Sequence, residues 1–352
     1  MLPDYYKSIL AHFDLASNPK SIVRFGEGHI HETYLVETRE QNPDYILQKI
    51  NNDIFRNVSG MMNNIEAVTR HIELKIKELP GHNPAFESLR LIYTKTGQSF
   101  YQDGNDDYWR MYAYIPGTVT YQKLDDPSLA IEAGKAIGFF QLMLSDIETP
   151  LIETIPDFHN IILRISQYLE AKSSAHPTRG AYAKNDLNFV ESRFDSMGVY
   201  FKALLEKAVI RPTHNDTKLN NILFDSSNKA LCLVDLDTVM PGYVHFDYGD
   251  ALRTMANTAV EDEEDLTKVH FDNQVYNDFT RGYLEEAGTF LDSEEIKLLP
   301  YAPIYMTFII GLRFLTDYLN GDVYFRVHHP GHNLERARVQ FRLVEEMERV
   351  LL

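Results

Sequence analysis

One stretch, residues 213–237, constrains the fold of this chain more than any other part of the sequence. Asp216 follows His214 by two residues, Asn221 follows Asp216 by five, and Asp235 stands at the end of an apolar run. A single Asp after a His is common, and paired Asn residues occur often in turns and caps. The combination of these positions indicates a catalytic site much more specifically than any one of them does.

The segments between these residues predict a hairpin. Residues 222–224 and 231–234 are apolar and have strand composition, and residues 225–229 between them are typical of a turn. A hairpin of this length returns the chain, so we expect Asp235 to lie beside Asn221. One magnesium ion would then contact both side chains.

This arrangement is typical of phosphoryl transfer. Enzymes that transfer a phosphoryl group act mainly by positioning the acceptor hydroxyl and by neutralising charge on the phosphates. We therefore expect Asp216 to accept the proton of the acceptor hydroxyl, and Asn221 and Asp235 to bind Mg²⁺. ATP is the expected phosphoryl donor.

The composition limits the compartment and the kinds of partner. With 352 residues the chain is long enough for two lobes, and 44% hydrophobic with 24% charged residues is typical of a globular protein. A net charge of -17 disfavours nucleic-acid binding, which needs clustered Lys and Arg. One cysteine, Cys232, cannot form an internal disulfide, and the first residues lack a basic and apolar leader. The apolar run at 301–315 is too short to span a bilayer, so we expect a cytoplasmic protein.

The N-terminal residues predict a loop that covers phosphates. Residues 21–25 and 33–36 have strand composition, and the segment between them contains Gly26 and Gly28. A strand, a glycine loop and a returning strand form the cover over the ATP phosphates in kinases. This loop lacks a third glycine, and an ordinary hairpin would have the same composition.

The third predicted strand, residues 45–50, lies where kinases place a lysine that holds the ATP phosphates. By analogy with V-A-I-K, Gln48 rather than Lys49 falls at the lysine position. Adjacent strand residues face opposite sides of a sheet, so either Gln48 contacts the nucleotide without a charge or a shifted register brings Lys49 there. The helical pattern at 58–77 places Glu66 where the partner of that lysine belongs. Without the lysine, Glu66 would be only a surface charge.

A hinge is predicted where the strand composition ends. Pro116 and Gly117 follow the apolar and aromatic run that finishes at Ile115. We therefore expect the adenine to lie against the backbone between Ala113 and Ile115.

The predicted fold is α+β and bilobal, like that of protein kinases. Residues 1–115 would form an ATP-binding lobe with an antiparallel sheet and a helix, and residues 116–352 a mainly helical lobe for catalysis and substrate binding. Further strands are predicted at 89–93 and 109–115. Further helices are predicted at 4–13, 127–145, 158–172, 185–208, 294–319 and 334–351.

Two further positions leave alternatives open. Asp247 precedes a helix expected to begin near Gly249, so it either caps that helix or braces the catalytic loop. Arg313 interrupts an apolar helical run, where an unpaired cation is unfavourable. It either pairs with Asp317, four residues further on, or faces a ligand.

The same residues carry a resemblance to a known superfamily. Through His214, Asp216, Asn221 and Asp235 the chain resembles the aminoglycoside phosphotransferase and choline kinase superfamily, small-molecule kinases with a protein-kinase-like fold. More closely, it resembles the N-acetylhexosamine 1-kinase family, which phosphorylates the anomeric hydroxyl of GlcNAc and GalNAc. The matching stretches are 26–36, 45–51, 213–223, 234–242, 246–253, 261–271 and 311–325.

The resemblance implies a function and a set of site residues. It implies Asp216 as the catalytic base, Asn221 and Asp235 as magnesium ligands, and a glutamine at position 48 as an ordinary feature of the family. The sugar contacts that it implies are His29, Asp237, Arg313 and Tyr324. A neutral sugar is held by side chains that donate to and accept from its hydroxyls, with aromatic rings against its apolar face.

Two other functions compete with a sugar kinase. A choline, homoserine or aminoglycoside kinase would need an aromatic cage or an acidic acceptor pocket, and the net charge of -17 is compatible with either. A pseudokinase that binds nucleotide without turnover is the third reading. Intact Asp216, Asn221 and Asp235 argue against it, whereas Gln48 is the one feature in its favour.

Overall fold

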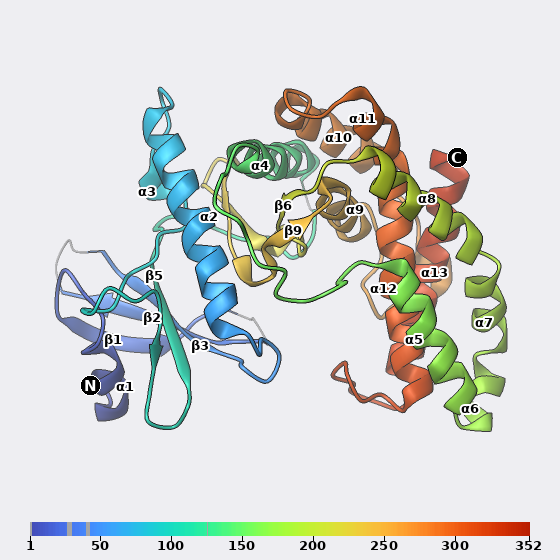
Figure 1. Cartoon of the computed structure of the whole chain (residues 1–352), viewed down its shortest axis with the longest axis horizontal. Coiled ribbons are helices and arrows are strands. Elements are labelled where there is room, and N and C mark those ends of the chain that lie inside the picture. Colours follow the sequence, from blue (N-terminus) through green and yellow to red (C-terminus); the bar gives the residue numbers. More distant parts are fainter. Residues whose placement is uncertain (1, 27–29, 40–42, 125) are drawn as a thin grey trace. The chain divides into compact units, whose positions relative to one another are not determined.

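The computed structural model describes residues 2–26, 30–39, 43–124 and 126–352 (Figure 1). The chain forms two compact units. Unit 1 comprises Met1–Thr120, Met143–Thr154 and Ile222–Pro241, and unit 2 comprises Tyr121–Leu142, Ile155–Asn221 and Gly242–Leu352. The hairpin that follows the catalytic loop belongs to unit 1 because Val119 and Phe224 exchange two backbone hydrogen bonds of 2.9 Å.

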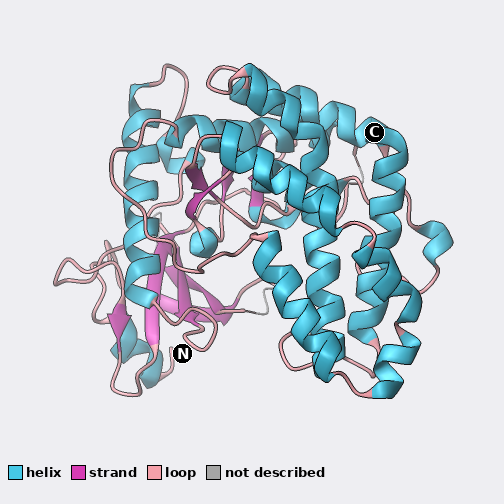
Figure 2. Cartoon of the chain, turned by 45° about the vertical axis from the view of Figure 1, so that its right-hand side comes forward, coloured by secondary structure: helices cyan, strands magenta, loops and turns pink. Residues whose placement is uncertain are grey.

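Unit 1 is built on an antiparallel sheet, as the sequence predicted. Within the described residues it has five strands in the order β1-β2-β3-β5-β4. Figure 2 draws the strands in magenta and the helices in cyan. Their bounds are β1 Pro19–Arg24, β2 Glu32–Thr38, β3 Tyr45–Ile50, β4 Tyr101–Gln102 and β5 Tyr108–Ala113. Leu47 pairs with Met111 and Gln48 with Arg110, which sets the register of β3 against β5.

The two faces of this sheet differ in chemistry because neighbouring strand residues point to opposite sides. One face packs Leu47, Trp109 and Met111 against Ile9 and Leu10 of helix α1 (Asp4–Leu10). Burying such side chains contributes roughly 25 cal/mol for each Å² removed from water. The opposite face carries Gln48 and Arg110, where the Arg110 side chain reaches Met62 of helix α2 (Val58–Glu78).

The predicted hairpin is confirmed, and one predicted strand is wrong. Strand β7 (Ile222–Phe224) pairs antiparallel with β8 (Ala230–Leu233). Residues 89–93 form no strand in the described chain; Leu91 makes a single isolated bridge to Tyr112. The short helix α3 (Pro84–Glu87), with its proline in the first turn, lies just before this segment.

Unit 2 is mainly helical, as predicted, with two short strands, β6 (Arg211–Thr213) and the end of β9 (Met240–Gly242). Helix α4 (Ser128–Leu144) begins in it. The others are α5 (Ile161–Ser174), α6 (Pro177–Tyr182), α7 (Lys184–Glu191), α8 (Phe194–Lys207), α9 (Val244–Met255), α10 (Asn273–Ala287), α11 (Ser293–Leu298), α12 (Ala302–Asn320) and α13 (His332–Leu351).

Two predicted helices are each broken in two. The helix expected at 185–208 ends at Glu191, where the Ser192 hydroxyl donates to the Phe189 carbonyl and so competes with the backbone ladder. The helix expected at 294–319 is interrupted by a 3₁₀ turn that contains Pro300, which has no N–H to donate.

Helix α12 forms the centre of unit 2 and packs against α5, α9 and α13. Residues Ser293–Asn320 are long and apolar enough to cross a membrane by length and composition alone. However, 72% of their most apolar window is buried inside the protein, as in the core helix of a globular unit. Gly311 permits the close approach of α13, because a Cβ there would lie 2.7 Å from the Phe341 ring.

Candidate active site

The predicted catalytic loop lies between β6 and a 3₁₀ turn, Leu219–Asn221, in unit 2. The structure brings Asp216 and Asn221 together. The Asn221 side-chain NH₂ donates to the Asp216 carbonyl at 2.9 Å and to its carboxylate at 3.2 Å. The Asn221 oxygen is then the atom that faces away from this pair and is suited to a hard cation such as Mg²⁺.

Asp247 braces this loop, so the second of its two predicted roles is confirmed. It lies in the first turn of α9, and its carboxylate accepts the backbone N–H groups of His214 at 2.9 Å and Asn215 at 2.7 Å. Gln141 donates to the same carboxylate at 3.0 Å. Burial raises the pKa of Asp247 above its ordinary value, although these donors and His214 oppose the shift.

The brace explains an unusual backbone conformation. Asn215, immediately before Asp216, has a φ of 65°, in the left-handed region that non-glycine residues rarely adopt. Such conformations persist where the surroundings enforce them, and they are frequent at functional sites. Here the bond from the Asn215 N–H to Asp247 supplies the restraint and turns the Asp216 side chain relative to the preceding strand.

Lys218 is a site residue that the sequence reasoning missed. Its ammonium group lies 2.8 Å from an Asp216 carboxylate oxygen, and 43% of its side chain is exposed. Burial alone would raise the pKa of Asp216, but Lys218 holds it below the ordinary value. The carboxylate is therefore ionised at neutral pH. The signal in the sequence was a cation two residues after the predicted base.

Arg313 and Tyr324, two of the predicted sugar contacts, lie together in unit 2. The Arg313 guanidinium is within 5.7 Å of the ring centres of Phe158, Tyr324 and Phe325. Asp317 does not pair with Arg313; it accepts the backbone N–H groups of 323–325 at 2.8–3.0 Å. The pairing alternative is therefore not observed, and Arg313 faces an aromatic surface of which Tyr324 is 68% exposed.

A buried histidine, His159, lies among the charged groups of unit 2. It is 4% exposed and packs between Phe158 and Phe246, at ring distances of 4.4 and 5.0 Å. Neither of its ring nitrogens makes a hydrogen bond of ordinary geometry within the described residues. Burial lowers its pKa to about 3, and the nearby guanidinium groups of Arg313 and Arg164 add to the effect. The only feature of this residue in the sequence is its position beside an aromatic side chain, Phe158.

The second predicted metal ligand, Asp235, follows β8 in unit 1. It has a φ of 63° and begins the 3₁₀ turn Leu236–Thr238. Donor atoms of His31, Asp235 and Asp237 all lie within 4.8 Å of one another. Half-buried carboxylate oxygen is a donor that Mg²⁺ accepts, so Asp235 fits the predicted role. Its sharing of one ion with Asn221 stays a prediction, because the two residues belong to different units.

The hydrogen-bond and ion-pair partners of Gln48 and Lys49 show which of the two residues stands at the lysine position of β3. Gln48 lies on the same face of the sheet as Arg110, and its Oε1 atom accepts the Arg110 Nε–H at 2.9 Å. Arg110 in turn donates to Asp237. Lys49 faces the other way and pairs with Asp107 at 2.6 Å. The register is therefore unshifted, and the residue at the lysine position is Gln48. Arg110, which the sequence reasoning missed, stood out only as a cation within an apolar strand.

The remaining predicted nucleotide contacts lie in unit 1. Glu66 accepts the Tyr93 hydroxyl at 3.3 Å. Ala113 and Ile115 are buried, and the Ala113 N–H is bonded to the Arg90 carbonyl at 2.9 Å. Gly26 has a φ of 74°, which glycine adopts without strain. Two further predicted contacts, Gly28 and His29, lie outside the described residues.

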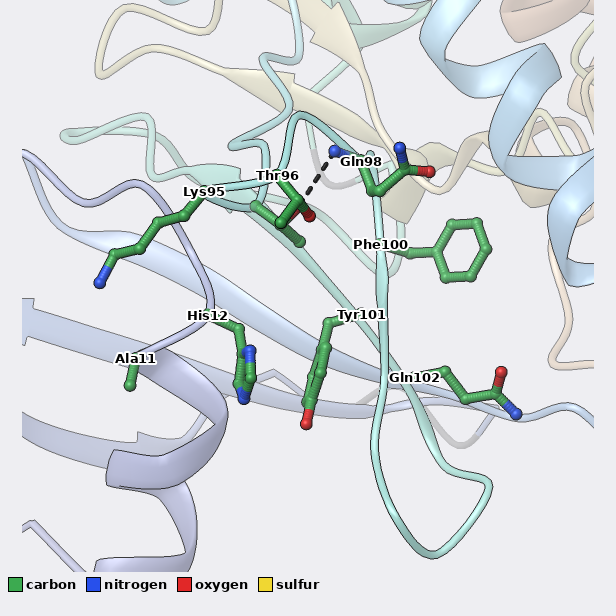
Figure 3. Close-up of a pocket in the computed structure, with 9 residues that line it drawn as sticks. Ala11, His12, Lys95, Thr96, Gln98, Phe100, Tyr101 and Gln102 are labelled. Atoms are coloured by element: carbon green, nitrogen blue, oxygen red, sulfur yellow. Dashed lines mark hydrogen bonds between the residues drawn. The ribbon is translucent and has the colours of Figure 1, made fainter.

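A separate hollow of about 320 Å³ lies on unit 1 (Figure 3). His12 and Tyr101, which contribute to its lining, stack on each other with ring centres 3.9 Å apart and an interplanar angle of 14°. Lys95 and Gln98 contribute to its lining. None of the predicted site residues lines this hollow.

Comparisons with known proteins place this geometry in a family. The family model described as "Phosphotransferase enzyme family" (APH) matches residues 21–286. Among solved structures, a microcompartment-associated aminopropanol kinase is similar with a TM-score of 0.64 and 14% identity, over 99% of this chain and 97% of that one. A spectinomycin phosphotransferase in complex with ADP and spectinomycin has a TM-score of 0.60 and 13% identity, over 99% and 97% of the two chains. A choline kinase from Streptococcus pneumoniae has a TM-score of 0.55 and 13% identity, over 98% of each chain.

At these identities the solved structures establish a shared fold, whereas the family model covers most of the chain. The residues that it spans include the catalytic loop with Asp216 and Asn221, and also Asp235. The proteins that share the fold of this chain include kinases of small molecules. Because the family model matches most of its length, the chain belongs to the phosphotransferase enzyme family.

Proposed function

We propose that this protein is an ATP-dependent sugar kinase that phosphorylates the anomeric hydroxyl of N-acetylhexosamines. The observation that carries the proposal is the Asp216 loop: Asp247 holds its backbone, and Asn221 and Lys218 flank the ionised Asp216 carboxylate. A carboxylate so placed accepts the proton of an acceptor hydroxyl as the phosphoryl group is transferred.

Each residue has a role in this proposal. Asp216 orients the hydroxyl and takes its proton, and Lys218 offsets negative charge beside it. Asn221 and Asp235 hold Mg²⁺, which, when bound, neutralises charge on the phosphates of ATP. Asp247 keeps the catalytic loop in its left-handed turn. Water is a competing acceptor, and a bound sugar excludes it from the carboxylate.

The charges around the aromatic surface favour a neutral acceptor. Arg164 donates to the Phe158 carbonyl at 2.7 Å, and the Arg313 guanidinium lies 5.4 Å from the centre of the Phe158 ring, so the two cations lie around one region of unit 2. Two guanidinium groups there would repel the ammonium group of choline, of an amino alcohol or of an aminoglycoside. A sugar offers hydroxyl and N-acetyl oxygens to Arg313 and an apolar ring face to Tyr324.

A coupled assay of ADP release tests the proposal. We expect Mg²⁺-dependent turnover with GlcNAc or GalNAc, and phosphorus NMR should place the phosphate on C1. The panel should contain plain hexoses, choline, ethanolamine, homoserine and kanamycin at matched concentrations. Phosphate on C6, or turnover with the cationic acceptors alone, would overturn the sugar assignment. ADP binding with no turnover for any acceptor would favour a pseudokinase.

A further inference from the structure

The group of polar side chains on the inner face of the unit 1 sheet has one cation at its centre, Arg110. Strands β3 and β5 are neighbours (Figure 1), and Arg110 on β5 lies opposite Gln48 on β3. The side chain of Arg110 is 1% exposed. A cation this deeply buried is stable only if its charge is compensated nearby.

The partners of Arg110 occupy its guanidinium group. Its Nη1 and Nη2 atoms donate to the two oxygens of Asp237, with Nη2 to Oδ2 at 2.9 Å, and its Nε donates to Gln48. Nη1 also lies 4.0 Å from the Met62 sulfur. Gln48 in turn donates to the Thr33 hydroxyl at 3.0 Å, which holds its amide in the orientation that accepts from Arg110. Arg110 is thus directed at Asp237 and away from solvent.

His31 completes the environment of Asp237. Its Nδ1 atom accepts the backbone N–H of Asn51 at 3.0 Å, so the ring hydrogen belongs on Nε2, which donates to Asp237. Both oxygens of Asp237 thus accept from Arg110, and His31 is a further partner, so this carboxylate compensates the charge of the buried guanidinium group.

This compensated carboxylate lies two residues from the predicted magnesium ligand. Donor atoms of His31, Asp235 and Asp237 lie within 4.8 Å of one another, which is close enough for one ion to contact all three. An imidazole with two carboxylates is a donor set for manganese and other transition metals rather than for magnesium alone. In this protein Arg110 already occupies both oxygens of Asp237.

We propose that Arg110 is a positioning residue of the nucleotide and metal site, which acts through Asp237. By binding both Asp237 oxygens it holds the turn that begins at Asp235 and removes Asp237 from the set of metal ligands, so that Asp235 alone presents its carboxylate to the cation. Gln48, which stands at the position of the usual β3 lysine, accepts from Arg110 Nε and so helps to hold the guanidinium group on Asp237. The inference rests on the proposed Mg²⁺-dependent phosphoryl transfer.

Binding of Mn²⁺ to the full chain without nucleotide tests this inference, followed by electron paramagnetic resonance. Arg110→Met removes the charge and the guanidinium donors but keeps an apolar side chain of similar length. Arg110→Gln keeps hydrogen-bond donors without the charge. In both variants Asp237 becomes an available ligand, so we expect Mn²⁺ affinity to rise by about tenfold or more over the wild type. Adding Asp237→Asn to either variant should abolish the increase. Arg24→Met, at an exposed ion pair of β1, is the matched control and should bind Mn²⁺ like the wild type.

Thermal unfolding with and without Mn²⁺ covers the case in which an uncompensated Asp237 weakens the fold. A cation that binds only the folded chain raises its melting temperature, so the Arg110 variants should gain more from Mn²⁺ than the wild type. Arg110→Lys keeps the charge and should restore weak Mn²⁺ binding. Unchanged Mn²⁺ affinity in both neutral variants, or an increase that survives Asp237→Asn, would overturn the inference.

All of these measurements use only the metal. A wild type that phosphorylates none of the sugars would refute the proposed substrate and leave the metal results interpretable. Conversely, sugar turnover in the wild type together with Arg110 variants that bind Mn²⁺ normally would refute the role of Arg110 alone.

Discussion

The Asp247 carboxylate accepts the backbone N–H of Asn215 at 2.7 Å, and this bond ties the start of helix α9 to the residue before the predicted base. The bond joins positions 32 residues apart in the chain. Because Asn215 is in the left-handed conformation, release of this bond would let the loop relax toward an ordinary turn. The position of Asp216 thus depends on a residue that has no place in the chemistry.

Asp247→Ala should therefore impair catalysis and stability together. Two buried N–H groups lose their acceptor, which should cost about 2–4 kcal/mol of the free energy of unfolding, and kcat should fall by at least about tenfold. Urea unfolding and steady-state kinetics measure both. Asp272 is a matched control, because it also accepts two backbone N–H groups, at the start of α10. Asp272→Ala should cost about 1 kcal/mol and leave kcat unchanged, and an equal kcat loss in both variants would contradict a specific role for Asp247.

Asp216→Asn should remove the proton acceptor while keeping the shape of the side chain. We expect kcat to fall by roughly 10²–10⁴, with little change in ADP affinity, since proton transfer contributes to the reaction step. Isothermal titration with Mg·ADP separates binding from turnover. Asp225→Asn, in the exposed hairpin turn, is the control for a local charge change. A variant that retains most of its kcat would exclude Asp216 as the base.

Arg313→Lys should weaken acceptor binding more than nucleotide binding. Lysine keeps the charge but lacks the planar fork that binds acceptor oxygens and lies over aromatic rings. We expect the acceptor KM to rise by about tenfold, with the KM for ATP within about twofold of the wild type. Arg342→Lys, at a surface pair with Glu345 and Glu346, controls for the substitution itself. A rise in the ATP KM alone would place Arg313 on the nucleotide side.

His159 should make the fold sensitive to acid. Its pKa is about 3 in the folded chain and 6.5 in its ordinary state, so below pH 6.5 the unfolded chain binds a proton that the folded chain does not. Its contribution therefore lowers the free energy of unfolding by about 1.4 kcal/mol for each pH unit between 6.5 and 3. His159→Phe, which packs between the same rings, removes that contribution. The difference in unfolding free energy between the variant and the wild type should grow by about 2–3 kcal/mol from pH 6.5 to pH 4.5, as urea titrations can measure. A constant difference would mean that His159 has the same pKa in the folded and unfolded chains, and would contradict the prediction.

Local pattern was sufficient for much of the fold. Apolar runs with turn residues between them identified β3 and the β7–β8 hairpin, and helical periodicity identified α2 and α13, within a few residues of their observed ends. Two predicted helices were too long because a side chain or a proline within each of them interrupts the backbone hydrogen bonds. The Ser192 hydroxyl and Pro300 each interrupt a segment whose apolar periodicity continues past them.

By itself the sequence determined which side chains are the candidates for the chemistry, because the pattern of Asp216, Asn221 and Asp235 is recognisable from residue type and spacing within 20 residues of chain. Only the tertiary structure decided which groups control them. Asp247 reaches the loop from 32 residues away, and Arg110 reaches Asp237 from 127 residues away. Hydrogen bonds and ion pairs act over a few ångströms of space whatever the separation along the chain, so partners of this kind become visible only when strands and helices have brought them together.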